Sequence, residues 1–347
     1  MSVKRVSLVV NHNSHKGNRF FCEDNPEVNR DDSLRPNIKL RNTLNSLGIA
    51  LDTHDIRPVD NSDLVIFIDM PDPKGPEFRL ARRLKIPCHC ILLECELLHK
   101  RNADLDLHKM FERIYTYQDR LIDNRRYYKV NYTFPLPLQN DIPIHNARDL
   151  FCVMIAGNKW ARHAQELYSE RIRAIRWFEQ NHPDKFSLYG TEWAELHRFR
   201  KGLLRGILNN IKPIRRLFTK PYPSYRGTIE KKSTIVSRAK FSICYENALG
   251  IPGYITEKIF DCFLSGCVPV YLGADNVQDH IPNDCFIDKR LFSSYDALFQ
   301  YLYSMTEVEY LGYQTRINQF LRGGKSYPFS IAHYIQTVVT GINGSSA

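Results

Sequence analysis

Short apolar runs alternate along the chain with longer stretches in which apolar residues recur at helical spacing. The runs have the length of buried strands and cover residues 6–10, 64–68, 88–93, 150–156, 241–245 and 268–272. Helical spacing marks other segments, at 38–47, 78–84, 257–265, 295–303 and 329–342. Strands that alternate with helices pair in parallel, so the pattern predicts an α/β protein built on parallel sheets.

The polar residues of greatest chemical interest follow the apolar run at 241–245. They are Glu246, Asn247, Tyr254, Thr256, Glu257 and Lys258. Ligands of parallel sheets bind here, beyond the carboxyl end of a strand. Thr256 is placed to cap the next helix; a lysine beside exposed helix N–H groups suits a phosphate, and a carboxylate suits sugar hydroxyls. A capped helix with solvated charges would show the same residues, so the pattern alone leaves a purely structural role open.

The stretch from residue 241 to 273 carries a more specific signal. It reads FSICYENALGIPGYITEKIFDCFLSGCVPVYLG. The run YEN, a glycine-containing loop, YITEK, an apolar helix and GCVPVYLG together resemble the signature of the family 10 glycosyltransferases, the α-1,3/1,4-fucosyltransferases. The resemblance implies a GT-B architecture, in which two Rossmann-like domains face each other across a cleft and the second binds the donor nucleotide.

The same resemblance implies an activity. The chain would be an inverting glycosyltransferase that moves fucose from GDP-fucose to a hydroxyl of a glycan acceptor, such as a cell-surface polysaccharide or a lipopolysaccharide-type glycan. The donor contacts that it implies are Arg171, Tyr225, Glu246, Asn247, Tyr254, Thr256, Glu257 and Lys258. Two alternatives stay open: the same mechanism with another deoxysugar or amino-deoxysugar nucleotide, and a nucleotide-sugar-binding protein without catalysis.

A proline-rich tract divides the chain. Pro135, Pro137 and Pro143, with polar residues between them, mark a linker. A chain of 347 residues is long for one core and comfortable for two domains. We therefore predict an acceptor-side domain at 1–145 and a donor domain at 146–347. The resemblance implies that the last helix can cross back to the first domain.

Two acids, Glu94 and Glu96, end the predicted strand at 88–93. Carboxylates are rare in such a place unless they are partnered or functional, and alternation along a strand points the two side chains in opposite directions. The resemblance implies a glutamate here as the general base. We assign Glu94, with Glu96 as its substitute. The alternative is a pair of surface acids that bind Lys100 or Arg101.

A basic helix follows the predicted strand at 150–156. The resemblance implies that one arginine of this helix grips the nucleotide diphosphate, for which the bidentate guanidinium is well suited. We match that arginine to Arg171, and Arg173 stays open because the register is uncertain. Arg176 fits a solvated basic face.

The segment at 196–220 is unusual in composition. It holds eight Lys and Arg and no acid, a large share of the formal net charge of +10, and its apolar residues recur at helical intervals. A basic amphipathic helix of this kind predicts peripheral contact with an anionic membrane that carries a lipid-linked glycan acceptor. An ordinary surface helix or mobile loop is the alternative. No nucleic-acid partner is expected, because no base-reading module accompanies the charge.

The cysteines and the chain start bear on location. Nine cysteines lie mostly inside apolar runs without a paired C-x-x-C, which predicts free thiols of a reducing compartment. The first apolar run is too short for a signal peptide, and no stretch of about 18 apolar residues occurs. We expect a cytoplasmic protein, peripheral on the inner face of the membrane.

The sequence contains only weak signals for metal binding and for contact with an acceptor. No D-x-D loop follows a strand, so no metal or other cofactor is required, although a non-essential divalent metal is compatible. Asp69 and Asp72 have D-x-x-D spacing but lie in the acceptor domain, and we give them little weight. Residues in the loop after the first strand could face an acceptor sugar or simply be solvated: His12, Asn13, His15 and Lys16.

Overall fold

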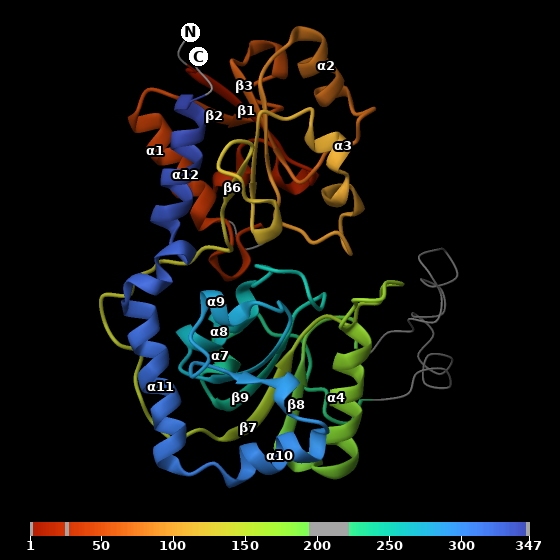
Figure 1. The fold of residues 1–347 in the computed structure, drawn as a ribbon, viewed down its shortest axis with the longest axis vertical. Helices are drawn as coiled ribbons and strands as arrows, with labels where there is room; N and C mark the ends of the chain where they lie inside the picture. Colours follow the sequence, from red (N-terminus) through yellow and green to blue (C-terminus); the bar gives the residue numbers. More distant parts are fainter. Residues whose placement is uncertain (1–2, 25–27, 194–221, 345–347) are drawn as a thin grey trace.

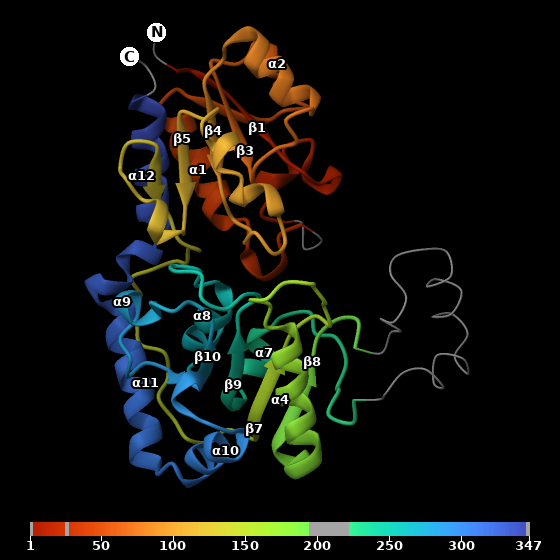
Figure 2. The same ribbon diagram turned by 45° about the vertical axis from the view of Figure 1, so that its right-hand side comes forward.

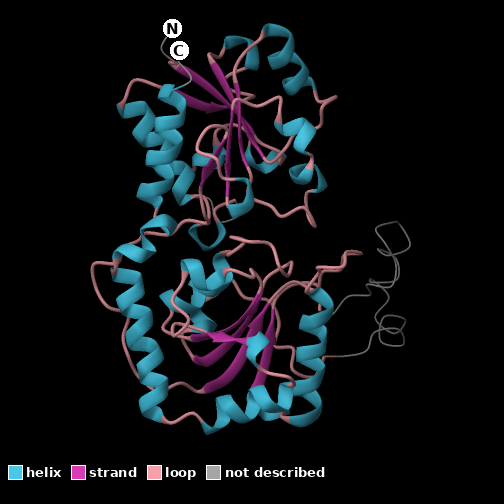
Figure 3. Cartoon of the chain, in the orientation of Figure 1, coloured by secondary structure: helices cyan, strands magenta, loops and turns pink. Residues whose placement is uncertain are grey.

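The computed structural model describes residues 3–24, 28–193 and 222–344, which fold into two α/β domains stacked along the long axis (Figure 1). Figure 3 shows one parallel sheet at the centre of each domain with helices around it. The predicted basic segment at 196–220 lies outside the described residues. No helix in the described ranges is long and apolar enough to cross a bilayer.

Six described strands form the first sheet, in the order β2-β1-β3-β4-β5-β6, and every neighbouring pair is parallel. The strands are β1 Arg5–Val9, β2 Ala50–Thr53, β3 Leu64–Ile68, β4 Cys88–Ile91, β5 Arg113–Thr116 and β6 Tyr127–Lys129. The helices of this part of the chain are α1 Arg35–Ser46, α2 Pro76–Leu84 and α3 Leu105–His108.

Five described strands form the second sheet, in the order β11-β10-β9-β7-β8, again all parallel. They are β7 Leu150–Ile155, β8 Phe186–Tyr189, β9 Ala239–Tyr245, β10 Val268–Leu272 and β11 Ile287–Asp288. The described helices after β6 along the chain are α4 Tyr168–Asn181, α7 Ser233–Val236, α8 Glu257–Leu264, α9 Val277–His280, α10 Tyr295–Ser304, α11 Glu307–Arg322 and α12 Ile331–Gly344, the last of which packs on the first domain. Short 3-10 turns join the elements: η1 Asn13–His15, η2 Arg19–Phe21, η3 Arg30–Asp32, η4 Val59–Asn61, η5 Lys100–Ala103, η6 Asp119–Leu121, η7 Pro183–Lys185, η8 Lys289–Leu291 and η9 Gly324–Phe329.

Alternation along the strands sends side chains to two separate cores in each domain. In β3, Leu64 and Ile66 pack with α1, whereas Val65 and Phe67 pack with α2 on the other face. In the second domain, one face of the sheet packs with α8 and the other with α4 and α10. Burial on both faces explains why these strands read as continuous apolar runs.

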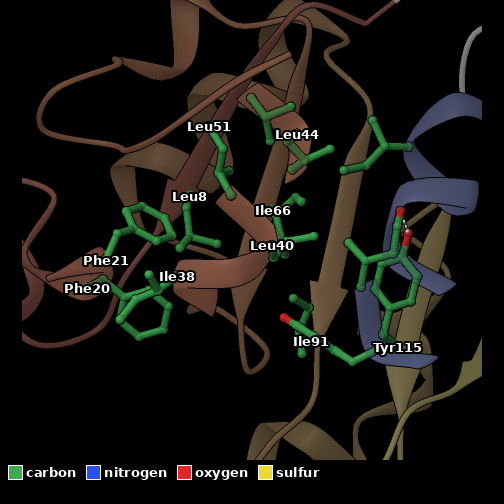
Figure 4. Close-up of a cluster of buried hydrophobic side chains, with 14 of the residues drawn as sticks. Leu8, Phe20, Phe21, Ile38, Leu40, Leu44, Leu51, Ile66, Ile91 and Tyr115 are labelled. Atoms are coloured by element: carbon green, nitrogen blue, oxygen red, sulfur yellow. Dashed lines mark hydrogen bonds between the residues drawn. The ribbon is translucent and has the colours of Figure 1, made fainter. Parts of the chain in front are cut away.

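The last helix returns to the first domain. Figure 2 shows α12 beside α1, and Tyr334 Oη of α12 donates to Asn37 Oδ1 of α1 at 2.9 Å. Tyr334, Val338 and Ile342 belong to the same core as Leu40. Figure 4 shows this core, with α12 passing beside Tyr115.

The predicted boundaries need small corrections. The strand expected at 88–93 ends at Ile91, because the β5 ladder ends there, so the two acids follow it in a loop. Strands β2, β5, β6 and β8 and helix α11 were not predicted; the strands are only three or four residues long, which is too short for a periodic signal. All nine cysteines lie in the described ranges and are free thiols, and Cys22 is the one that is not fully buried.

Candidate active site

The polar cluster after β9 is organised by Glu246, whose side chain is fully buried. Its carboxylate accepts the backbone N–H of Thr256 at 2.8 Å and the Thr256 hydroxyl at 2.7 Å. Thr256 does occupy the N-cap position of α8, as predicted. Its side chain makes no capping hydrogen bond, because the hydroxyl oxygen accepts from Lys258 instead of from a helix N–H, and the hydroxyl donates to Glu246.

Lys258 lies in the first turn of α8 with its side chain 18% exposed. Its ammonium group donates to Glu246 at 3.1 Å and to the Thr256 hydroxyl at 2.9 Å, and it lies 3.5 Å from Glu257. Burial would lower the pKa of Lys258, but the carboxylates of Glu246 and Glu257 outweigh it and raise the pKa. Lys258 is therefore a cation that Glu246, Thr256 and Glu257 fix at the N-terminus of a helix.

Glu257 is the more exposed acid of the cluster. Burial alone would raise its pKa, yet the ammonium groups of Lys258 and Lys232 lower it to about 2. Lys232 also pairs with Asp261 at 2.8 Å, and its backbone N–H donates to Asp31 of the first domain at 3.2 Å. The structure thus places the Lys232 ammonium group against α8, where it pairs with Asp261 and lies 3.8 Å from Glu257.

Arg171 points into the protein and is only 4% exposed. Its Nη2 atom donates to the carbonyl oxygens of Tyr245 at 2.6 Å and Glu246 at 2.8 Å, and to Asn247 Oδ1 at 3.0 Å. Asn247 in turn donates to the Tyr254 hydroxyl at 3.2 Å. The guanidinium therefore fixes the end of β9 and the loop after it.

The other arginines of α4 differ from Arg171. The side chain of Arg173 is 69% exposed and pairs with Glu170. Arg176 was assigned to a solvated face, which is wrong: it pairs with Glu179 at 2.7 Å and its guanidinium stacks over Tyr222, 3.8 Å from the ring centroid. Of the two candidates for the phosphate arginine, Arg171 alone reaches the loop after β9 in the described structure.

Tyr225 lies apart from this cluster. Its hydroxyl donates to the carbonyl oxygen of Gly190 at 2.9 Å, and its backbone bridges to Leu188 of β8. In the sheet order β9-β7-β8 this edge is two strands away from β9. The structure therefore does not bring Tyr225 beside Lys258.

Glu94 faces this cluster from the first domain. Burial raises the pKa of the Glu94 carboxyl, and the negative charge of Asp69 adds to the effect. The positive charges of Lys159 and Lys258, both in the second domain, act in the opposite direction. Lys159, in the loop after β7, was not predicted as a site residue. Its position beyond the carboxyl end of a parallel strand, where ligands of such sheets bind, could have indicated it.

The loops on the two sides of the junction are locked together. Cys95 and Tyr117 of the first domain form one buried cluster with Ala248, Ile251 and Tyr254 of the second. The rings of Tyr117 and Tyr254 lie 5.1 Å apart, centroid to centroid. Glu94 is the residue immediately before Cys95, so it lies directly beside the packed contact that includes Tyr254.

A polar contact completes the junction. Asp119 accepts from Lys129 of its own domain at 2.5 Å, and from His280 at 2.7 Å and Asn276 at 2.8 Å in the second domain. Burial opposes ionisation, but these partners hold the pKa of Asp119 well below its usual range. An ionised Asp119 thus ties the two domains together beside the site.

The remaining candidate residues, for metal binding and for acceptor contact, lie outside the cluster around Glu246. Among the described residues no group of three or more His, Cys, Asp or Glu side chains could hold a metal ion. Asp69 is buried and Asp72 is exposed, so the D-x-x-D pair does not converge. In the loop after β1, His12 and Asn13 are exposed and His15 and Lys16 are half-buried, and their contact with an acceptor stays a prediction. Glu96 is half-buried and stays the substitute for Glu94.

Two facing parallel-sheet domains are the architecture of GT-B glycosyltransferases. The solved α1,3-fucosyltransferase in complex with GDP-fucose matches with a TM-score of 0.52 and 14% identity, over 99% of this chain and 91% of that one. Anabaena Alr3699/HepE in complex with UDP-glucose matches with a TM-score of 0.53 and 11% identity, over 98% and 99%. At these identities the likeness establishes the fold.

The family is indicated by sequence. Residues 214–320 match the model described as glycosyltransferase family 10 (fucosyltransferase) C-term, which confirms the predicted resemblance over this part of the second domain. The chain is 29% identical to the alpha-(1,3)-fucosyltransferase FucT of Helicobacter pylori over 139 residues, 36% of this chain and 28% of that protein. It is 42% identical to an alpha-(1,4)-fucosyltransferase of Arabidopsis thaliana over 67 residues, 19% and 16%. The alignments span less than a third of these curated relatives.

Proposed function

We propose that the protein is an inverting fucosyltransferase that moves fucose from GDP-fucose to a hydroxyl of a glycan acceptor. The observation that carries the proposal is the family 10 segment itself, which folds so that Lys258 stands at the N-terminus of α8 and faces Glu94 across the domain junction. Lys258 at a helix N-terminus is suited to bind a diphosphate, and the carboxylate of Glu94 is suited to take the proton of an acceptor hydroxyl.

The donor would place its diphosphate at the N-terminus of α8. Lys258 and the positive end of the helix dipole favour an anion there. Glu257, ionised and partly exposed, is available to the sugar hydroxyls, whereas Glu246 is committed to Thr256 and Lys258. In this proposal Arg171 shapes the donor loop through the end of β9 and supplies positive charge behind it.

The reaction would be a single displacement. The Glu94 carboxylate takes the proton of the acceptor hydroxyl while its oxygen forms a bond to the anomeric carbon of fucose. The bond from that carbon to the β-phosphate oxygen breaks on the opposite side, and GDP leaves with the electron pair. Lys258 and the α8 N-terminus stabilise the negative charge on the departing diphosphate.

The donor test is a thermal-shift comparison of nucleotide sugars. The fold alone does not choose the nucleotide, because the protein solved with UDP-glucose matches as well as the one solved with GDP-fucose. We expect GDP-fucose to raise Tm, since a ligand at a hundredfold excess over its Kd stabilises a protein by about 2.7 kcal/mol. UDP- and dTDP-sugars at the same concentration serve as controls. A larger shift with either would select the same mechanism with a different donor.

We also propose that residues 196–220 hold the enzyme on an anionic membrane near a lipid-linked or lipopolysaccharide-type acceptor. The support is the sequence: eight cations and no acid occur within 25 residues. Each cation close to such a surface contributes about 1 kcal/mol. Co-sedimentation with anionic vesicles should be strong at low salt and weak at high salt.

Two variants test this membrane contact. One changes five cations of the segment to Gln: Arg200, Lys201, Arg205, Arg215 and Arg216. The charge-matched control changes five exposed cations elsewhere: Lys74, Arg79, Arg83, Lys109 and Arg226. The first variant alone should lose vesicle binding. Equal binding by both variants would assign the effect to net charge and remove this role from the segment.

A further inference from the structure

A buried acid with unusual geometry lies behind Glu94. Strand β3 ends at Ile68, and the next residue, Asp69, has a left-handed backbone with φ of 58°. This conformation is uncommon outside glycine, although Asp and Asn adopt it more readily than other residues. Asp69 is only 6% exposed, so its carboxylate must have protein partners.

The partners of Asp69 are the backbone that carries Glu94. A single oxygen, Oδ1, accepts the N–H of Leu93 at 2.8 Å, the N–H of Glu94 at 3.0 Å and the side-chain amide of Asn102 at 2.8 Å. Asn102 closes the arrangement, because the same amide nitrogen also donates to the Glu94 carbonyl oxygen at 2.8 Å. Its own oxygen accepts the N–H of Met70 at 2.8 Å.

These bonds replace a strand ladder that has ended. The last ladder-type bond of this segment runs from Leu92 N–H to the Tyr115 carbonyl oxygen at 2.9 Å. Beyond it the N–H groups of Leu93 and Glu94 need other acceptors, and Asp69 supplies them. Tyr132 adds a bond to the Leu93 carbonyl oxygen at 2.6 Å. Glu94 thus leaves the sheet in a fixed direction rather than on a free loop.

We propose that Asp69 is the positioning residue of the proposed base, holding the Glu94 backbone through its carboxylate and keeping a fixed negative charge beside the Glu94 side chain. The proposal rests on the proposed function of Glu94. An amide oxygen could accept the same backbone bonds, so the presence of a buried charge calls for a second role. That role is to strengthen Glu94 as a proton acceptor, because a nearby anion favours its protonated form.

The charges around Glu94 come from several elements. Burial is the largest influence that raises the pKa of Glu94, followed by Asp69, and Glu257 acts in the same direction. The ammonium groups of Lys159 and Lys258 lower it. The phenols of Tyr132 and Tyr168 also face Glu94, and burial raises the pKa of both, so they stay neutral. Among these neighbours, Asp69 is the one acid that the first domain contributes.

The first test is Asp69→Asn, which can keep an acceptor oxygen and tolerates the left-handed backbone but removes the charge. Carbon-13 NMR titration of the Glu94 carboxyl, assigned by comparison with Glu94→Gln, should show a lower pKa than in the wild type, because the neighbouring negative charge is gone. The acid limb of the kcat/KM profile should move to lower pH by the same amount. Asp72→Asn, three residues away and exposed, is the matched control and should change neither. An unchanged Glu94 pKa in Asp69→Asn would overturn the electrostatic role.

The second test is Asp69→Ala, which removes the acceptor as well. We expect kcat to fall about 100-fold, the size typical of a misplaced catalytic group, with GDP affinity unchanged. Asn102→Ala should give a smaller loss of the same kind. Wild-type kcat in a folded Asp69→Ala would overturn the positioning role, and if this variant does not fold, the Asp69→Asn titration decides.

The outcomes separate this inference from the function on which it rests. If Glu94→Gln keeps wild-type turnover, Glu94 is not the base, and the proposed function loses its mechanism. If Glu94→Gln is inactive but Asp69→Asn leaves both the Glu94 pKa and the pH profile unchanged, only the role of Asp69 fails. The NMR titration needs no donor or acceptor, so it remains decisive even before the acceptor is identified.

Discussion

Glu94→Ala should abolish fucosyl transfer while leaving donor binding nearly intact. A general base acts on the acceptor hydroxyl in the transition state and does not hold the diphosphate, so the loss should fall on kcat, by about 100- to 10,000-fold. Steady-state kinetics and calorimetric titration with GDP measure the two quantities. Glu96→Ala is the matched control, because it removes the same group two residues away.

The pH profile gives this prediction a second observable. Glu94 must be ionised to accept a proton, so activity is lost as pH falls through its pKa. Burial raises that pKa. The acid limb should therefore lie at a higher pH than the pKa of an ordinary glutamate, which is about 4.3. Near-wild-type turnover in Glu94→Ala together with inactive Glu96→Ala would show that the other carboxylate is the base.

Lys258→Ala should weaken donor binding and turnover together. Removing a charge-assisted contact to the diphosphate costs roughly 2 kcal/mol or more, which corresponds to about a 30-fold increase in the Kd for GDP. The change also leaves the buried Glu246 carboxylate without its cation, so Tm should fall as well. Calorimetry with GDP and thermal unfolding measure the two effects.

Two arginine variants of α4 complement the Lys258→Ala experiment, one as a second test of the diphosphate site and one as a control. Arg171→Ala should also reduce GDP affinity by roughly 2 kcal/mol, because the loop after β9 loses its anchor. The exposed Arg173→Ala is the control and should behave as wild type. If Lys258→Ala and Arg171→Ala both keep wild-type GDP affinity, the diphosphate does not bind at α8.

The orientation of Arg171 is predictable from the helical period of the residues around it. Arg171, Ala174, Ile175 and Phe178 recur at helical spacing and share the buried face of α4. A cation on such a face must be satisfied by the protein, and here it binds backbone carbonyls. A family motif names the residue type at a position, but helical phase decides whether it faces solvent.

Other features of the site had no local signal. The α/β pattern and the strand, helix and strand around α8 follow from apolar periodicity, because burial on both faces leaves a strong trace. Contacts between distant residues leave none: Asp119 and His280 are separated by 161 positions. In the sequence, Asp69 is marked only by its D-x-x-D spacing with Asp72. Its bonds to Leu93 and Glu94 depend on the neighbouring ends of β3 and β4, which sheet order determines.

The return of α12 makes the first domain discontinuous in sequence. Tyr334, Val338 and Ile342 complete the core that Leu40 and Leu44 begin, so a fragment that stops at residue 145 would expose this apolar face of α1 to water. The folding unit therefore includes both ends of the described chain. Within the described residues, two separate backbone segments therefore join the domains, and any opening of the junction must bend both at once. Such a double hinge permits rotation about the line through the two crossings and resists twisting.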